Sequence, residues 1–499
     1  MSDEKAPANP FDRVFDAGHA VVACSTFEEQ HTLELIKLAA YAHRVPVVAW
    51  SAVTGVRDAA IEGGGEPKTE SPAAGLYHMA RDPTRRVCVT LDLAPYFEDA
   101  RVLRAWRELA HRTEERRGHL IMLDTTHELP ALVDNYAVRL DVPFPSDEEI
   151  RRVTRRVVKR ALDERSIEVR VKRSESDELI GSLRGLTRRQ IERLLTGVIS
   201  EDNRLDGGDI KRLLDEKRRL VADAGVLEHV DVLADLDQVA GLRTLKRWLE
   251  QRRAAFTPEA KQFGLDPPRG VLMLGVQGTG KSLTAKAVAT AWRRPLVRLD
   301  PGRLYSKFIG ESERTLRDAL AQAEAMAPIV LWIDEIEKGF ASVGGSGSSD
   351  GGLSKRMFGT MLTWMNDHRS PVFMIATAND IEALPPELLR KGRFDEIFFV
   401  DLPSPEVRRA VFEIHLKKRD RDPSEFDLDA LAEAADGFSP AEIEQAIVGA
   451  LHGAFGDQRT LDTEAVIAQL ETSPPLSVTA REKVAALRAW AEGRCVPAD

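Results

Sequence analysis

Gly275-Val-Gln-Gly-Thr-Gly-Lys281-Ser282 is the stretch of sequence that decides the fold. It follows the apolar run 271–274 and precedes a run with helical character, 283–292. A strand, a glycine-rich loop and a helix in this order form a phosphate-binding loop. Its glycines allow the tight turn that aims backbone N–H groups at phosphate oxygens, and the helix N-terminus adds partial positive charge. We therefore expect this segment to bind a nucleotide.

Two side chains of the loop have chemistry of their own. Lys281 reaches the β- and γ-phosphates in such loops, and the Ser282 hydroxyl holds Mg²⁺. The competing interpretation, a glycine-rich turn before an ordinary lysine, becomes weak once the following strands are considered. The loop residues that we expect to contact the nucleotide are Gly275, Gln277, Gly278, Thr279, Gly280, Lys281, Ser282 and Leu283.

Two further apolar runs end in polar side chains. Residues 329–333 have the pattern of a strand buried on both faces, and Asp334 and Glu335 follow them. The carboxyl ends of parallel strands meet at one edge of a sheet, so we expect these carboxylates beside the phosphate loop. Asp334 would support Mg²⁺, through water, and Glu335 would activate the attacking water. Residues 372–376 lead to Asn379, whose amide would bond the γ-phosphate and that water, or would simply favour a turn.

Arg390 and Arg393 stand close together in a glycine-containing turn before the strand-like residues 397–400. An arginine is able to stabilise the charge on a transferring phosphoryl group, an effect worth roughly 10³–10⁵ in rate. By themselves, two such residues are solvated surface charges. In this context we expect them to project toward a neighbouring molecule.

The order of these motifs resembles that of the AAA ATPases. The resemblance implies ATP hydrolysis to ADP and phosphate, with ATP and Mg²⁺ as cofactors, and a homo-oligomer for which a hexamer is favoured. It covers roughly residues 232–470. The implied motifs are Walker A at 275–282, Walker B at 329–335, sensor 1 at Asn379 and an arginine-finger region at Arg390 and Arg393.

Two other segments are similar to parts of the same family. Residues 237–242 resemble the segment whose backbone contacts adenine, which implies that Val239 and Ala240 lie at the base. Pro440 and Ala441 stand where some relatives have a sensor 2 arginine. Relatives with the second region of homology also lack that arginine, so its absence does not argue against hydrolysis.

Residues 304–314 have the form of the family's pore loop 1, in which an exposed aromatic side chain grips an extended polypeptide. The alternative for Phe308 is plain core packing. The glycine- and serine-rich run 343–352 takes the place of a second pore loop, or is an inert insertion. The residues assigned to the first loop are Lys307, Phe308, Ile309 and Gly310.

The first half of the chain repeats the second half at low fidelity, without its catalytic residues. No glycine or lysine follows the strand-like residues 20–24, and Asp92 follows 87–91 without a glutamate. We interpret residues 15–200 as an AAA-like module that does not hydrolyse ATP; the alternative is an unrelated α/β domain. The paired segments are 119–132 with 372–384, 138–152 with 399–409, and 185–194 with 437–446.

The predicted fold class is α/β: a P-loop parallel sheet with a small α-helical lid, preceded by the degenerate α/β module. The end of the chain, 476–499, is expected to be an amphipathic helix followed by a frayed tail. The predicted domains are a tail (1–14), the degenerate module (15–200), a helical linker (201–231), the large ATPase subdomain (232–402), the lid (403–475) and the C-terminal helix and tail (476–499).

Composition limits the setting and the partners. The net charge of −10 argues against a general polyanion binder, so nucleic acid is not an expected partner, and the basic run 151–160 is expected to be a solvated helix face. No apolar run is long enough to cross a bilayer, and the N-terminus lacks the apolar core of a signal peptide. Three scattered cysteines fit a reducing cytoplasm.

Most of the chain also resembles a largely uncharacterised AAA subfamily encoded by a chloroplast open reading frame and by many bacteria. In photosynthetic bacteria that subfamily is associated with inorganic-carbon use. Two functions follow from the sequence. One is a ring that uses ATP to remodel a protein substrate; the alternative is a regulatory ATP-dependent switch or scaffold whose N-terminal module docks a partner.

Overall fold

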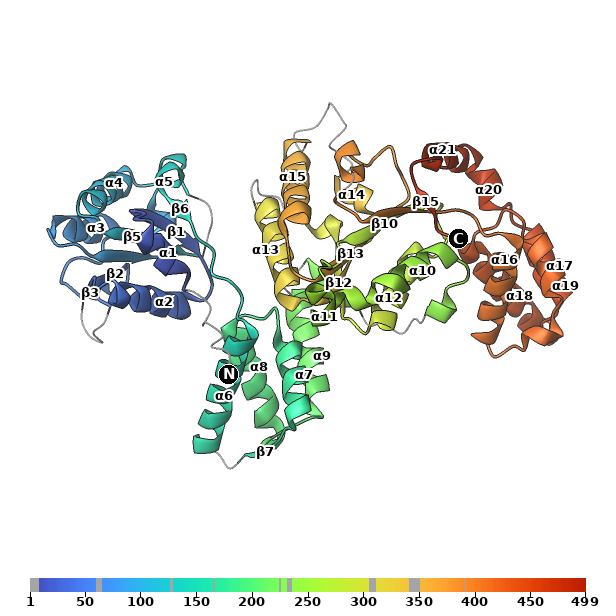
Figure 1. The fold of residues 1–499 in the computed structure, drawn as a ribbon, viewed down its shortest axis with the longest axis horizontal. Coiled ribbons are helices and arrows are strands. Elements are labelled where there is room, and N and C mark those ends of the chain that lie inside the picture. Colours follow the sequence, from blue (N-terminus) through green and yellow to red (C-terminus); the bar gives the residue numbers. More distant parts are fainter. Residues whose placement is uncertain are drawn as a thin grey trace. The chain divides into compact units, whose positions relative to one another are not determined.

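The computed structural model describes residues 9–59, 65–125, 129–164, 167–223, 226–230, 236–304, 311–340, 351–390 and 392–499. The chain forms two compact units, Met1–Pro145 with Thr187–Gln190, and Ser146–Leu186 with Ile191–Asp499 (Figure 1). The fold class is α/β with parallel sheets, as predicted. The predicted module 15–200 extends over the first unit and the beginning of the second, and the predicted domain limits stay predictions.

The first unit contains a six-stranded sheet with the order β3-β2-β4-β5-β1-β6. β3 pairs antiparallel with β2, and the other neighbours pair in parallel. The strands are β1 (Val21–Ser25), β2 (Val47–Ser51), β3 (Gly55–Asp58), β4 (Val87–Leu91), β5 (His119–Asp124) and β6 (Val138–Arg139). The helices are α1 (Pro10–Asp16), α2 (Glu29–Ala42), α3 (Pro72–Arg81), α4 (Ala100–Glu115) and α5 (Ala131–Tyr136).

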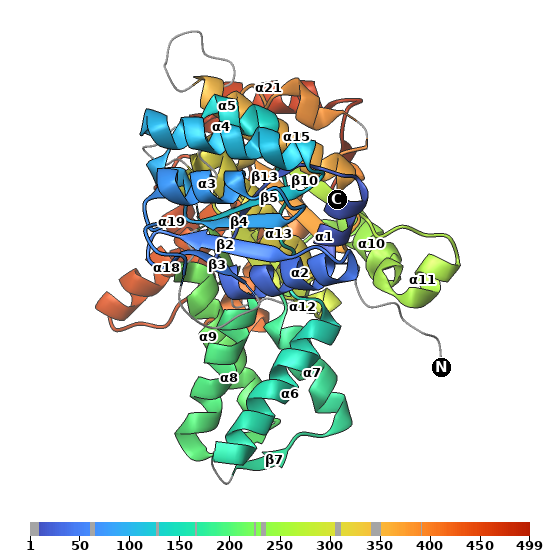
Figure 2. The ribbon, with the colours of Figure 1, turned by 90° about the vertical axis from the view of Figure 1, so that its left-hand side faces the viewer.

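Helices cover both faces of this sheet, which explains why its strands are apolar at consecutive positions. All five residues of β4 are buried. α1 and α2 lie on one face of the sheet, and α3 and α4 lie on the other (Figure 2). Phe11 and Ile36 belong to the apolar cluster of the first face, and Leu76 and Trp106 to that of the second.

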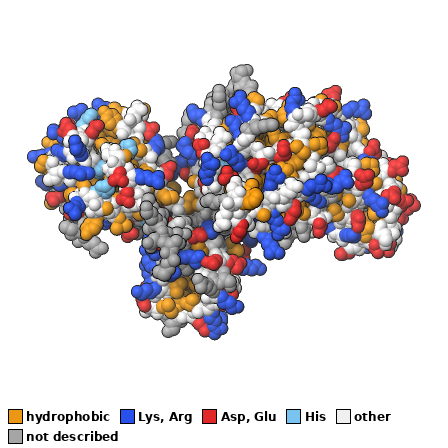
Figure 3. Space-filling model, viewed as in Figure 1, with side chains coloured by type: hydrophobic (Ala, Val, Ile, Leu, Met, Phe, Trp, Pro, Cys, Tyr) orange, Lys and Arg blue, Asp and Glu red, His pale blue; other side chains and the backbone are white. Residues whose placement is uncertain are grey.

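A helical segment begins the second unit. It consists of α6 (Asp147–Glu164), α7 (Arg173–Leu183), α8 (Arg188–Asp202) and α9 (Asp209–Asp223), with short strands β7 (Glu168–Arg170) and β8 (Arg204–Asp206). The basic side chains of α6 face solvent (Figure 3), and Arg151, Arg152 and Arg156 form ion pairs with nearby carboxylates. The run 151–160 is therefore a solvated helix face, as expected.

The sheet of the second unit has the order β15-β14-β10-β13-β12-β11-β9. Its five central strands follow the order that β6, β1, β5, β4 and β2 have in the first unit, so the two sheets share one topology. The strands are β9 (Leu227–Val230), β10 (Gly270–Gly275), β11 (Leu296–Leu299), β12 (Ile329–Ile333), β13 (Val372–Ala378), β14 (Glu396–Val400) and β15 (Val496–Pro497).

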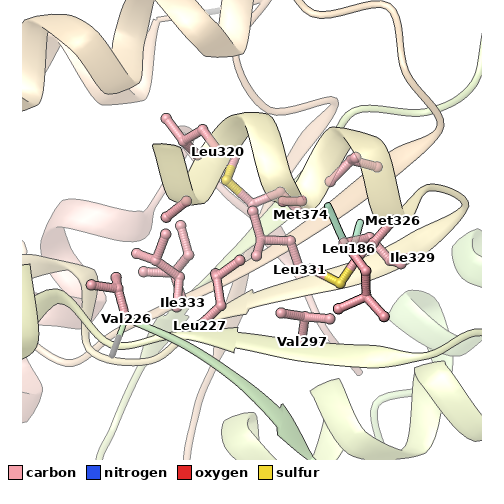
Figure 4. Close-up of a cluster of buried hydrophobic side chains, with 14 of the residues drawn as sticks. Leu186, Val226, Leu227, Val297, Leu320, Met326, Ile329, Leu331, Ile333 and Met374 are labelled. Atoms are coloured by element: carbon pink, nitrogen blue, oxygen red, sulfur yellow. The ribbon is translucent and has the colours of Figure 1, made fainter. Parts of the chain in front are cut away.

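Two apolar clusters hold this sheet between helices. Leu331 and Ile333 of β12 pack with Leu320 and Met326 of α13 on one face, where the helical segment contributes Leu186 (Figure 4). α10 and α12 cover the other face. The helices are α10 (Arg243–Arg252), α11 (Pro258–Gln262), α12 (Lys281–Trp292), α13 (Glu311–Met326), α14 (Ile336–Phe340) and α15 (Gly351–Asp367).

The lid has a core of its own, in which Phe412, Leu431, Ile443 and Val466 come from four different helices. Each of the helices α16 and α18 begins at a proline after a serine N-cap, so the sequence itself fixes their starts. The four helices are α16 (Pro405–Lys417), α17 (Leu428–Ala434), α18 (Pro440–Gly456) and α19 (Thr463–Glu471).

Two segments differ from their expected structure. The expected helical linker 201–231 contains α9 but also β9, which pairs antiparallel with β11 because Leu227 belongs in the core. The expectation of a frayed end was wrong. After α20 (Leu476–Thr479) and α21 (Arg481–Ala491), β15 pairs with β14, and Ala498 is buried in the core beside α10.

None of the described helices is both long and apolar enough to span a bilayer.

Candidate nucleotide site

The phosphate-binding loop joins β10 to α12. Gly278 and Gly280 have φ values of +78° and +89°, a region that glycine adopts without steric cost. Gly280 is the N-cap of α12, so the helix begins at Lys281. A Cβ atom on Gly275 would lie 2.0 Å from the carbonyl oxygen of Val400 on β14. The path of the loop therefore requires glycine at all three positions.

Lys281, the first residue of α12, extends its side chain to the loop and is 5% exposed. Its Nζ donates to the carbonyl oxygens of Gly275, at 2.9 Å, and Val276, at 2.6 Å. Burial lowers the pKa of Lys281 to about 8, and nearby carboxylates, Glu337 above all, oppose this shift. A buried ammonium within a glycine loop at a helix N-terminus fits a ligand that carries phosphate oxygens.

Ser282 and Asp334 lie together, as oxygen ligands of a cation would. The Ser282 hydroxyl donates to Asp334 Oδ1 at 2.9 Å, and Thr377 Oγ1 donates to the same oxygen at 2.7 Å. A carboxylate and a hydroxyl at the phosphate loop fit Mg²⁺. Thr377 also accepts from the backbone N–H of Glu335 at 2.9 Å, and thus links the two acidic residues. Sequence reasoning missed Thr377, although a threonine ending an apolar strand just before Asn379 was a usable signal.

Glu335 and Asn379 come from neighbouring strands and meet at the sheet edge. Asn379 Nδ2 donates to Glu335 Oε1 at 3.0 Å. Lys338 forms an ion pair with the other carboxylate oxygen. Glu335 itself has φ of +50°, an uncommon value for a residue with a side chain, and such values cluster at functional sites.

These groups line a cavity of about 510 Å³ between the loop and the lid. Two predicted residues lie behind its wall: Gly275 ends β10, and Thr279 is 7% exposed with its hydroxyl donating to Val276. The predicted residues that line it are Gln277, Gly278, Gly280, Lys281, Ser282, Leu283, Asp334, Glu335 and Asn379.

Val239 and Ala240 are not among the residues that line this cavity. Val239 is buried in the apolar cluster on the α12 side of the sheet, and Ala240 packs against the lid core. The structure thus places the predicted adenine-contacting segment next to both subdomains and outside the cavity wall. The contact with adenine stays a prediction.

The lid contributes residues that sequence reasoning did not find. His415 and Lys418 of the α16 end and Glu444 of α18 line the cavity. Glu444 Oε1 lies 3.3 Å from His415 Nδ1 and accepts from Arg419 at 2.9 Å. Burial lowers the pKa of His415. These side chains come from two helices and form no local sequence pattern.

The lid also contacts the loop through its backbone. The N–H of Ala441 donates to the carbonyl oxygen of Gly278 at 3.1 Å. Pro440 and Ala441 line the cavity at the position where some relatives have an arginine. The first turn of α18 therefore closes one side of the site without a charged side chain of its own.

Arg390 and Arg393 do not line the cavity of their own chain, as far as the described residues show. Arg390 is exposed, and Arg393 is partly buried; its guanidinium nitrogen Nη1 is buried and has no hydrogen-bond partner within the described part of the chain. Burial is the main cause that lowers the pKa of Arg393, and the nearby charge of Arg390 lowers it further. The predicted pore loop residues Lys307, Phe308, Ile309 and Gly310 lie outside the described residues, as does most of the run 343–352.

The corresponding edge of the first unit is built differently. Residues 26–28, Thr-Phe-Glu, follow β1, whose place in the sheet matches that of β10. Glu28 accepts from the backbone N–H of Arg188 at 2.6 Å and from its guanidinium at 2.8 Å, and both side chains are nearly buried. An internal ion pair thus occupies this edge. That the first unit does not hydrolyse ATP stays a prediction.

Models of known protein families match three parts of this chain. Residues 271–402 match the ATPase family associated with various cellular activities (AAA). Residues 8–142 match the N-terminal domain, and residues 148–224 the second domain, of SpoVK-like AAA ATPases.

Three relatives span different shares of the chain. The uncharacterized AAA domain-containing protein ycf46 of Pyropia yezoensis is 33% identical over 95% of this chain and 96% of its own. The ycf46 protein of Gracilaria tenuistipitata var. liui is 37% identical over 82% of each chain. The proteasome-activating nucleotidase of Aeropyrum pernix is 37% identical over 39% of this chain and 48% of its own. Because likeness to ycf46 proteins runs along nearly the whole chain and the ATPase match covers the phosphate loop and the acidic sheet edge, this chain belongs to the AAA ATPase family, among the ycf46 proteins with SpoVK-like N-terminal domains.

Proposed function

We propose that this chain hydrolyses ATP to ADP and phosphate in the cavity between the phosphate loop and the lid. The observation that carries the proposal is one continuous set of hydrogen bonds. It runs from Ser282 through Asp334 and Thr377 to Glu335 and Asn379, beside a buried Lys281. When bound, MgATP supplies the scissile phosphoanhydride bond, and the cation neutralises phosphate oxygens.

The chain's own residues take separate roles in this proposal. The Lys281 ammonium exchanges the loop carbonyls for phosphate oxygens, and Ser282 and Asp334 hold the cation. Glu335 accepts a proton from the attacking water at its carboxylate, and Asn379 orients that water. The lid excludes bulk water and holds the nucleoside end of the ligand.

We further propose that copies of the chain assemble into a ring, with a hexamer favoured, and that the ring remodels a protein substrate in the cytoplasm. Support comes from Arg390 and Arg393, which lie outside their own cavity. The unpaired nitrogen of Arg393 would gain an acceptor if it completed the site of a neighbouring subunit. Relatives named proteasome-activating nucleotidase share the ATPase part and support a protein substrate. We propose no membrane or nucleic-acid partner.

Mixing two inactive variants tests the shared site. Glu335→Gln removes the water-activating carboxylate, and Arg393→Ala removes the charge offered to the neighbour. In a ring mixed one to one, about one quarter of the interfaces pair an intact Glu335 with an intact Arg393, so about a quarter of the wild-type rate should return. If the mixture stays as inactive as its components while they demonstrably co-assemble, the site is not shared. Lys281→Ala, which should abolish ATP binding, serves as the control when it is mixed with Glu335→Gln, because every subunit of that mixture has a defective site of its own and no activity should return.

The alternative function is an ATP-dependent switch or scaffold. Asn379 and Lys338 already bind the two carboxylate oxygens of Glu335. Because a bound carboxylate is less free to activate water, this arrangement favours slow ATP hydrolysis. In the first unit, α2 exposes Leu38 and Tyr41, apolar side chains suited to docking a partner.

A ring should show an ATPase rate per subunit that rises with protein concentration, and a switch should not. A Phe308→Ala variant should impair substrate processing only if the ring threads a polypeptide.

A further inference from the structure

Glu337 is a buried carboxylate beside the nucleotide site that none of the roles above uses. It lies in the first turn of α14, two residues after Glu335, and is 6% exposed. It is not among the residues that line the cavity. Burying a carboxylate costs free energy unless hydrogen bonds compensate, so a residue of this kind needs a physical reason.

One oxygen of this carboxylate holds the backbone of Asn379. Glu337 Oε1 accepts from the Asn379 N–H at 2.9 Å, and the Asn379 amide in turn donates to Glu335 at 3.0 Å. Asn379 follows the last residue of β13, where the sheet no longer fixes the backbone. The side chain of Glu337 therefore substitutes for a neighbouring strand at the point where the amide must be aimed.

The second oxygen is buried and has no hydrogen-bond partner among the residues that the structure describes. Burial is the largest cause that raises the pKa of Glu337, and the Asn379 N–H opposes it. Its own backbone N–H and the charge of Lys281 also oppose this rise in pKa. A carboxylate buried at this cost, with one oxygen bound to the backbone of Asn379, points to a constraint on geometry rather than to general stability.

We propose that Glu337 is a positioning residue, which fixes the backbone of Asn379 so that its amide stays in reach of Glu335 and of the attacking water. The proposal rests on the ATPase function proposed above. It predicts that Glu337 acts on kcat through Asn379 and has little effect on the affinity for ATP.

Amide hydrogen exchange of the nucleotide-free protein tests the hydrogen bond itself. Glu337→Ala removes the acceptor, and Glu337→Asp keeps the charge but withdraws it by one methylene. Both should accelerate exchange at Asn379 by about tenfold or more. Glu337→Gln retains an acceptor oxygen and should exchange as the wild type does. The exposed residue Glu382, in the same loop, gives the matched control Glu382→Gln, which should change nothing. Unchanged exchange in the Ala and Asp variants would overturn the proposal.

Kinetics then separate positioning from general damage. Glu337→Ala should lower kcat by about ten- to a hundredfold with the dissociation constant for ATP within about twofold, and Glu337→Gln should restore most of the rate. In an Asn379→Ala background, Glu337→Ala should cost nothing more, because the residue through which it acts is gone. Additive losses would refute the role, as would a Gln variant as slow as the Ala variant. If the wild-type protein did not hydrolyse ATP at all, the proposed function would fail, while the exchange experiment would still decide whether Glu337 holds Asn379.

Discussion

Lys217 offers a prediction whose size follows directly from the structure. It lies on α9, is 4% exposed, and has the positive charge of Arg184 close enough to disfavour its own. Burial, followed by Arg184, lowers the pKa of Lys217 from 10.5 to about 7. At about 1.4 kcal/mol per pH unit, that difference corresponds to roughly 5 kcal/mol of unfavourable free energy, as an upper bound, when the lysine is charged.

The sign of the pH dependence is fixed by which state binds the proton. Below pH 7 Lys217 is protonated in the folded and the unfolded protein, and the full unfavourable free energy of burying its charge is present. Between pH 7 and about 10.5 the unfolded chain binds the proton and the folded chain does not, so stability from this residue rises with pH by up to about 1.4 kcal/mol per unit. His229, whose pKa burial and Lys217 lower to about 4, titrates below this window.

Lys217→Met keeps the length of the side chain and removes its charge. We expect the variant to be more stable than the wild type at pH 7, and the difference to shrink as the pH rises to 9. Urea denaturation of the two proteins at pH 7, 8 and 9 measures this. Lys211→Met, at an exposed position of the same helix, is the control and should not alter the slope. Parallel curves for wild type and Lys217→Met across this range would refute the reasoning.

Three further outcomes are expected. Gly278→Ala would put a Cβ atom 2.9 Å from the Ser439 hydroxyl and force a residue with φ of +78°, so it should weaken ATP binding about tenfold, measured by titration of the nucleotide. Arg408→Ala removes hydrogen bonds to the carbonyl oxygens of Ala432 and Pro403 inside the lid. It should destabilise the lid by about 2–4 kcal/mol, which amide hydrogen exchange measures as faster exchange in the lid helices. Unchanged protection of those amides would contradict this expectation. Burial raises the pKa values of the first two thiols, Cys24 and Cys88, to about 12, so neither should react with alkylating reagents at pH 8 unless the first unit unfolds.

The local motifs of the site were predictable because their chemistry depends on residues adjacent in sequence. The glycine spacing before Lys281 has a steric cause at each position, and Asp334 and Glu335 follow an apolar run that must be a buried strand. The edge of a parallel sheet then brings such ends together. The α/β class of the first unit was predictable from similar apolar runs and from their likeness to the second half, whereas its strand order comes from the structure.

The remainder depends on contacts between distant segments. Glu444 meets His415 only after the lid helices have packed, and neither residue stands in a recognisable spacing. Thr377 is an ordinary strand residue until the register of β13 places its hydroxyl between the Asp334 carboxylate and the backbone N–H of Glu335. The two residues of β15 are too few to show a periodicity, so the sequence favoured a loose end. In each case the deciding contact joins segments that are far apart in the sequence.

The pairing of β15 with β14 has a practical consequence. A sheet edge with free N–H and C=O groups is a template on which strands of other molecules can add, and β15 occupies that edge of the ATPase sheet. A protein shortened by the last few residues would present β14 to its neighbours in solution. Aggregates of such a shortened protein would then report an uncovered strand and would say nothing about whether the nucleotide chemistry is intact.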